Sequence, residues 1–199
     1  MSTLIEDGRF ALRALRVRDL ELVYECLEDW APDENGSYTL QRADATLSVW
    51  LRQSADFRAA GEGTQAQALV FVVDGAPAGI CASTHLGTTV SVDLVAIHPE
   101  FRGRGLLKDF MAILRVYGFE TLGVEHVQFE TRADPGAIAS QVDVLEVPEV
   151  GQRASPSGRQ LRVWAYDRDH REARIPEHDA GIRARRRAAP SDGATPSIL

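Results

Sequence analysis

A turn rich in glycine and arginine, placed between a strand-like and a helix-like segment, constrains the fold of this chain more than any other feature. Residues 90–97 (VSVDLVAI) form an apolar run of strand length, which His98-Pro99 ends. Apolar residues then recur at helical spacing until Gly123 provides a stop, and residues 124–131 have the composition of a second strand. This order predicts two parallel neighbouring strands joined by a right-handed crossover through a helix.

The segments before this unit predict further strands and helices. Alternation in residues 9–17 predicts a strand, and Asp19 then suits the N-cap of a helix over residues 20–27. Asp74-Gly75 is a two-residue hairpin signal between strands over residues 69–73 and 79–84. The predicted side of one more helix consists of Leu40, Ala43, Leu47, Trp50 and Leu51.

The segments after the unit are less regular. Residues 136–145 predict a short helix that Pro148 ends, and residues 161–166 alternate like a final strand. From about His170 onward the composition predicts a polar, disordered tail, in which the arginines of residues 183–187 favour solvation over contact with an acidic partner such as RNA. With 199 residues, of which 44% are hydrophobic, we expect one domain over residues 1–169 and a tail over residues 170–199.

Composition narrows the functional class. A formal net charge of -7 argues against nucleic-acid binding and favours a cationic partner. No stretch approaches the roughly 18 to 20 apolar residues of a membrane span, and the first ten residues do not resemble a signal peptide, so we expect a cytoplasmic protein without a membrane partner. Cys26 and Cys81 belong to no CxxC pair, which favours buried reduced thiols and predicts no metal site.

The turn itself reads Arg102-Gly103-Arg104-Gly105-Leu106-Leu107. Glycines let the backbone approach a ligand closely, the N-terminus of the following helix favours anions, and arginine guanidinium groups bind phosphate oxygens. The spacing fits neither a dinucleotide-binding GxGxxG nor a P-loop, because Lys108 would have to be glycine in the first and would need a preceding glycine in the second. The alternatives are therefore a phosphate-binding turn of another kind and an ordinary tight loop with surface arginines.

The segment LVAIHPEFRGRGLLKDF resembles the coenzyme A-binding motif of the GNAT acetyltransferases. The resemblance extends more weakly over about 155 residues, and FVVDGAPAG, FETRADPGAIAS and LRVWAYD are most similar to ribosomal-protein N-terminal acetyltransferases. Arg102 and Gly105 match the family pattern, whereas Leu107 stands where the family has glycine or alanine. The resemblance implies an α/β (α+β) GNAT fold, a mixed and mostly antiparallel sheet of about six to seven strands with one parallel pair and flanking helices.

The resemblance also implies the cofactor and its site. Acetyl-CoA would be the co-substrate, with its pyrophosphate on the backbone amides of residues 102–107 and its pantetheine arm beside residues 94–97 as an added strand. Leucine at position 107 is compatible with this site if its side chain turns away from the ligand. The expected cofactor-binding residues are Val95, Ala96, Ile97, Arg102, Gly103, Arg104, Gly105, Leu106 and Leu107.

The catalytic residues are harder to assign. Many relatives carry a glutamate at the position of Ser91, and Asp93, nominally on the same strand face, is the nearest substitute as a general base. A structural hydrogen bond is the alternative role for Asp93, and Glu130 and His98 are weaker candidate bases. By resemblance, Ser140 would donate a proton to the departing thiolate, although a serine early in a helix also acts as a simple cap.

These features predict an N-acetyltransferase that acts on a primary amine, either a protein N-terminus or a small amine. An α-amino group has an unperturbed pKa near 8, against about 10.4 for lysine, so the missing glutamate favours N-terminal acceptors. Val147-Pro148-Glu149 replaces the Gly-Phe that the family usually has near the acceptor. The alternative is a diverged CoA-binding sensor or interaction module, and for both we keep a homodimer open.

Overall fold

The computed structural model describes residues 3–28, 40–59, 65–132, 145, 147–154, 158 and 160–168. The helix predicted over residues 136–145 falls outside this part of the chain except for Leu145, and the tail predicted over residues 170–199 falls outside it entirely. The division into a domain and a tail therefore stays a prediction.

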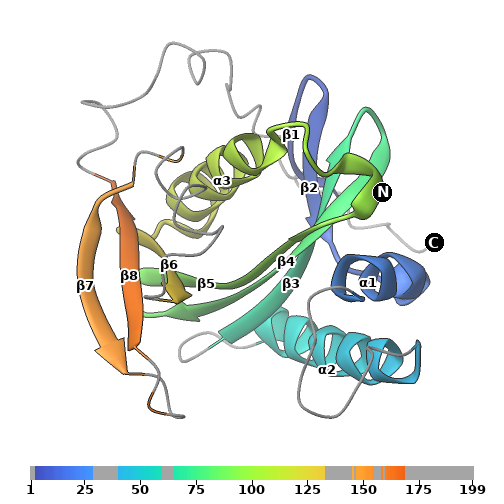
Figure 1. Ribbon diagram of the computed structural model, residues 1–199, viewed down its shortest axis with the longest axis horizontal. Coiled ribbons are helices and arrows are strands. Elements are labelled where there is room, and N and C mark those ends of the chain that lie inside the picture. The colour runs from blue at the N-terminus through green and yellow to red at the C-terminus, as the bar shows by residue number, and fades with distance from the viewer. Residues whose placement is uncertain are drawn as a thin grey trace, which may run out of the picture.

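The described strands form one mixed sheet (Figure 1). Its order is β1-β2-β3-β4-β5-β6-β8-β7, and all neighbours are antiparallel except the parallel pair β5 and β6. The mixed sheet and its parallel pair confirm the prediction, but the predicted number of six to seven strands was wrong, because the described residues form eight. The strands are β1 (Thr3–Asp7), β2 (Phe10–Ala14), β3 (Gln65–Val73), β4 (Ala76–Leu86), β5 (Thr89–Ile97), β6 (His126–Arg132), β7 (Glu149–Ala154) and β8 (Gln160–Asp167).

The two unexpected strands, β1 and β7, are edge strands whose sequences carry little signal. β1 is a five-residue strand that pairs with β2 across a turn at Gly8. β7 has the sequence EVGQRA and is exposed at nearly every position, so no apolar face produces an alternating pattern. β7 is therefore defined by pairing with β8 rather than by burial, whereas β1 buries only Ile5.

Three helices flank the sheet on opposite faces (Figure 1). α1 (Leu20–Leu27) and α2 (Leu40–Ala59) lie against the face formed by β3 and β4, whereas α3 (Leu106–Val116) lies on the other face. A wider π-helical turn, Tyr117–Leu122, follows α3 and ends at Gly123, as the glycine predicted. Within the described part of the chain, no helix is long and apolar enough to cross a membrane.

Asp19 lies at the predicted N-cap of α1 but its side chain makes no cap hydrogen bond. The carboxylate instead accepts two hydrogen bonds of 2.7 Å from the Arg13 guanidinium and one of 2.8 Å from the backbone amide of Arg16. Both charged side chains are only 6% exposed. A buried ion pair therefore joins β2 to the start of α1, which local helix-capping rules do not predict.

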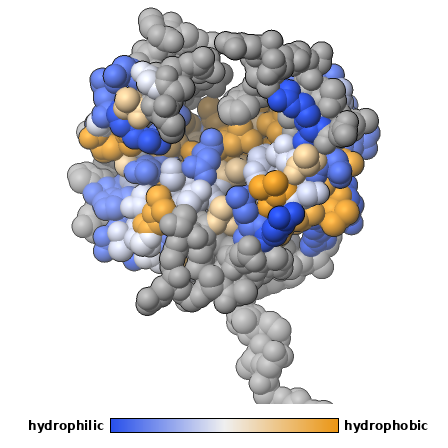
Figure 2. Space-filling view, turned by 90° about the horizontal axis from the view of Figure 1, so that it is seen from below, coloured by the Kyte–Doolittle hydropathy of each residue, from blue (hydrophilic) through white to orange (hydrophobic). Residues whose placement is uncertain are grey.

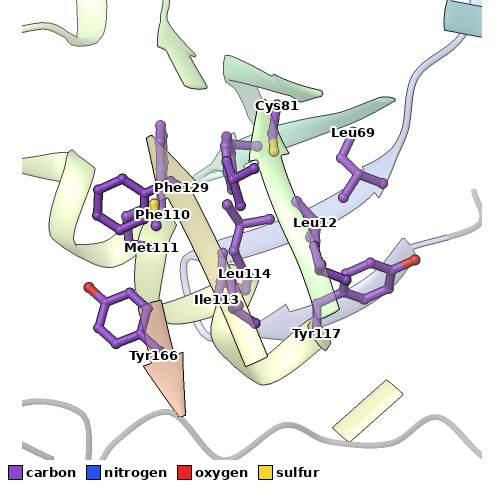
Figure 3. Close-up of a cluster of buried hydrophobic side chains, with 14 of the residues drawn as sticks. Leu12, Leu69, Cys81, Phe110, Met111, Ile113, Leu114, Tyr117, Phe129 and Tyr166 are labelled. Carbon is purple, nitrogen blue, oxygen red and sulfur yellow. The ribbon is translucent and has the colours of Figure 1, made fainter. Parts of the chain in front are cut away.

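The hydrophobic core consists of two clusters, one on each face of the sheet. The cluster beneath α3 includes Phe71 and Phe110, whose rings stack with centroids 4.2 Å apart. Figure 3 shows how α3 directs Phe110, Met111, Ile113 and Leu114 toward side chains of the sheet. The cluster on the opposite face joins α1 and α2 to the sheet and includes Leu94 and Ala96 of β5.

Candidate active site

The glycine turn joins the end of β5 to α3 through a short 3-10 helix, Pro99–Phe101. Gly103 and Gly105 have φ angles of 72° and 73°, in the left-handed region that glycine adopts most readily. Gly105 is the N-cap residue of α3. Because the first amides of a helix have no partner within the helix, the turn presents N–H groups and the positive end of α3 at one place.

The two leucines that follow Gly105 are anchored in the core. Leu106 is buried, and Leu107 is partly buried and packs against the cluster beneath α3. The Leu107 side chain is thus held by core packing, which meets the condition under which leucine is compatible with a phosphate site. The backbone amides of both residues belong to the first turn of α3.

The arginines of the turn differ in their contacts. Nε of Arg102 donates a 2.9 Å hydrogen bond to the carbonyl oxygen of Ile97, at the end of β5. The Arg104 guanidinium carbon lies 5.2 Å from the ring centroid of Phe101. Both arginines are exposed, and both place positive charge beside the glycines.

An open strand edge leads to this turn. β5 pairs with β6 only over four residues, from Thr89 opposite His126 to Val92 opposite Phe129. Beyond Val92, β5 continues with no partner on that side among the described residues, although β6 continues to Arg132 and pairs with β8 along its whole length. We refer to this unpaired edge of β5, residues 93–97, as the slot.

One hydrogen bond shows which residues of β5 direct their backbone N–H and C=O groups toward β4. The amide of His98, at the end of β5, donates to the carbonyl of Ala78, so the backbone groups of His98 point toward β4. Successive residues of a strand direct their backbone groups to opposite sides. Val95 and Ile97 therefore direct their N–H and C=O groups into the slot, whereas Ala96 faces β4. Of residues 94–97, which were expected to lie beside the pantetheine arm, the geometry favours Val95 and Ile97.

A β-bulge at Asp93 lies where the slot begins. Ser83 pairs with Val92 and Ala82 pairs with Leu94, which leaves Asp93 without a cross-strand partner. Before the bulge, Val90 and Val92 pack toward α3, and after it Leu94 packs toward α1 and α2. The bulge thus breaks the alternation that sequence reasoning assumed for the strand.

Asp93 is exposed and accepts a 2.6 Å hydrogen bond from Oγ1 of Thr84. Among the described residues, Thr84 is the one side chain that hydrogen-bonds this carboxylate. Thr84 pairs with Ser91 across β4 and β5, so these three polar residues lie close together. Thr84 carried no signal in the sequence, because only the strand register places it there.

The two weaker candidate bases are engaged in ion pairs. Glu130 is bound by the guanidinium of Arg153 at 2.5 and 2.8 Å, and His98 lies 2.5 Å from a carboxylate oxygen of Glu25 on α1. Because Arg153 engages both carboxylate oxygens of Glu130, neither oxygen is open to a substrate amine. Asp93 is therefore the candidate that the geometry favours among the three.

Ser140, the expected proton donor, lies outside the described residues, so its role stays a prediction. Two tyrosines near the core do not replace it. The Tyr117 hydroxyl donates to Gln67 at 2.9 Å, and burial raises its pKa to about 12. The Tyr166 hydroxyl donates to the carbonyl of Leu145. Both hydroxyls are committed to structural hydrogen bonds.

Hydrophobic and hydrophilic residues are interspersed on the face of the molecule that is seen from below (Figure 2). In the described part of the chain, no group of three or more histidine, cysteine, aspartate or glutamate side chains could hold a metal ion.

Comparison with known protein families finds no matching family profile, and comparison with curated protein sequences finds no match. Solved structures do match. A GNAT-family acetyltransferase from Bacillus anthracis has a TM-score of 0.65 and 12% identity, over 84% of this chain and 99% of its own. A ribosomal L7/L12 alpha-N-protein acetyltransferase in complex with coenzyme A has a TM-score of 0.64 and 9% identity, over 83% and 98%. A spermidine N-acetyltransferase from Vibrio cholerae has a TM-score of 0.62 and 11% identity, over 83% and 99%. The GNAT resemblance is thus confirmed, and this chain has the fold of the GNAT acetyltransferases.

Proposed function

We propose that this chain is an acetyl-CoA-dependent N-acetyltransferase that acts on a primary amine. The observation that carries the proposal is the placement of the glycine turn, which caps α3 and directly follows the unpaired edge of β5. A diphosphate bound on the turn leaves the pantetheine arm to run back along that edge toward Asp93. Val95 and Ile97 then pair with the arm as an added strand would.

The reaction requires three events at the end of the slot. First, the amine nitrogen attacks the thioester carbon, so that an N–C bond forms as the C–S bond breaks. In addition, the nitrogen loses a proton and the departing thiolate gains one. In this proposal, Asp93 receives the proton from the amine, directly or through water, and Ser140 supplies the proton to the sulfur. Thr84 fixes one carboxylate oxygen of Asp93, which leaves the other for the amine.

A cationic acceptor fits both the site and the chain. Asp93 is exposed, and the whole chain has a formal net charge of -7, so a protonated amine is attracted before it loses its proton. Two structural neighbours carry names that specify amines, one spermidine and the other the N-terminus of a ribosomal protein. A protein N-terminus or a small amine is accordingly the proposed acceptor class.

Binding and turnover measured separately test the proposal. Calorimetry with acetyl-CoA measures affinity, and release of the CoA thiol to a disulfide reagent measures transfer to polyamines, lysine and peptides with free N-termini. Cys26 and Cys81 are both buried and contribute little background to that reagent. Acetyl-CoA binding with turnover on one amine class supports the proposal. Binding without turnover on any amine identifies a CoA-binding module instead, and absence of both refutes the site.

Two substitutions test the assigned chemistry. Asp93→Asn and Ser140→Ala each should lower kcat at least about tenfold and leave the Kd for acetyl-CoA within about twofold, since each removes one proton-transfer group, typically worth 10² to 10⁴ in rate. Ser91→Ala serves as the control, because it removes a polar group from the same strand. An unchanged kcat in either variant removes that residue from the mechanism.

A further inference from the structure

Glu25 of α1 contacts His98, the residue that precedes the glycine turn, and neither side chain takes part in the proposed acetyl transfer. Nε2 of His98 lies 2.5 Å from Oε2 of Glu25 across 73 positions of the chain. The His98 side chain is 15% exposed and the Glu25 side chain 40%. The pair is therefore half-buried at the junction of α1, the end of β5 and the turn.

The second ring nitrogen of His98 fixes the direction of this hydrogen bond. The backbone amide of Glu100 donates to Nδ1 at 3.3 Å, so Nδ1 is an acceptor and the ring proton lies on Nε2. Nε2 thus donates to the Glu25 carboxylate. The ring caps the 3-10 helix with one nitrogen and reaches α1 with the other.

Further contacts join the same residues into one unit. The His98 ring meets the Phe101 ring edge-on with centroids 6.0 Å apart, and the His98 carbonyl accepts from the Phe101 amide. Burial raises the pKa of the Cys26 thiol, which follows Glu25 on α1, and the positive charge of Arg102 lowers that pKa in part. The first half of the turn therefore lies against α1, whereas its second half begins α3.

We propose that Glu25 and His98 are positioning residues that hold the glycine turn in its coenzyme-binding shape. Two glycines give the turn a wide range of backbone conformations, and ordering it on binding costs free energy. The hydrogen bond from His98 to Glu25 of α1 fixes the segment that precedes Gly103 before the ligand binds, so less free energy is spent on ordering the turn during binding. This inference rests on the proposed function, because it assumes that the turn binds coenzyme A.

Variants can separate the two roles of the ring. Glu25→Ala removes the acceptor on α1. His98→Asn keeps an acceptor near the Nδ1 position, and with it the cap on Glu100, but loses the donor to Glu25. His98→Gln keeps a donor near the Nε2 position and therefore keeps the hydrogen bond to the Glu25 carboxylate. Glu21→Ala is the matched control, since it removes the same residue type one helical turn earlier, at an exposed position of α1.

The experiment measures the Kd for coenzyme A by calorimetry, together with KM for acetyl-CoA, kcat at saturation and the melting temperature. We expect Glu25→Ala and His98→Asn each to raise Kd and KM about tenfold, the scale of one charge-assisted hydrogen bond, with kcat within about twofold. His98→Gln should recover most of the affinity, and Glu21→Ala should match the wild type.

The outcomes distinguish this inference from the proposed function. If the wild type binds coenzyme A and Glu25→Ala binds it equally well, the positioning role is refuted while the proposed function stands. If affinity falls only in proportion to a loss of folding, with His98→Gln no better than His98→Asn, the contact is structural and the inference also fails. If the wild type does not bind coenzyme A, the proposed function and the inference fail together.

Discussion

Replacing Gly105 by alanine separates the ligand-binding role of the turn from its conformational cost. Gly105 has φ 73° and ψ 10°, and Gly123, which ends the π-helical turn after α3, has φ 74° and ψ 16°. A Cβ atom built at either glycine has nothing within 4 Å. The two positions thus impose the same backbone strain on alanine without a steric clash, and only Gly105 lies in the proposed site.

The expected magnitudes follow from this pairing. An alanine in the left-handed region costs about 1 to 2 kcal/mol. In a domain of this size that cost lowers the melting temperature by about 2 to 8 °C for either variant. Gly105→Ala should additionally weaken coenzyme A binding, because a shifted backbone misdirects amides that donate to the diphosphate. Loss of one such charge-assisted hydrogen bond, about 1.5 to 3 kcal/mol, corresponds to roughly a tenfold to a hundredfold rise in Kd.

Thermal denaturation without ligand and calorimetry with coenzyme A give the two quantities for each variant. The expected pattern is an equal loss of melting temperature in both variants and a loss of affinity in Gly105→Ala alone. Equal melting temperatures with unchanged affinity in both would show that the turn is not the phosphate site. A loss of affinity in both would show that the effect comes from general destabilisation.

Three further changes test the fold around the site. Asp19→Asn should destabilise the protein by about 3 to 5 kcal/mol in chemical denaturation, because it leaves Arg13 buried without a counter-charge; a loss below about 1 kcal/mol would contradict the buried pair. Gly79→Ala would place a Cβ atom 2.6 Å from the carbonyl oxygen of Ala96, so we expect a loss of about 1 to 3 kcal/mol, and wild-type stability would contradict that close approach. Burial raises the pKa of Cys26 from 9.0 to about 12, so the folded protein holds this proton more tightly than the unfolded chain. The stability that Cys26 contributes is present below pH 9 and falls between about pH 9 and 12, by up to about 1.4 kcal/mol per pH unit, and Cys26→Ala should remove that part of the dependence.

The sequence by itself determined the features that depend on neighbours along the chain. The Asp74-Gly75 hairpin, the stop at Gly123 and the strand-turn-helix around Gly105 were all predicted, because turn chemistry and helical periodicity act over a few residues. The parallel pair β5 and β6 followed from the order of strand, helix and strand along the chain. These local rules predicted the strand-turn-helix unit and its parallel strand pair, whereas the fold as a whole was expected from the resemblance to the GNAT family.

Tertiary structure alone decided how distant residues complete the site. The bulge at Asp93 exists because β4 and β5 lose register between Ala82 and Ser83, and that register brings Thr84 to the carboxylate. Glu25 reaches His98 across 73 positions, and Glu130 is engaged by Arg153 of a strand that has no apolar face. Such contacts depend on strand pairing and on the packing of helices against the sheet, neither of which leaves a periodic trace in the sequence around any one residue.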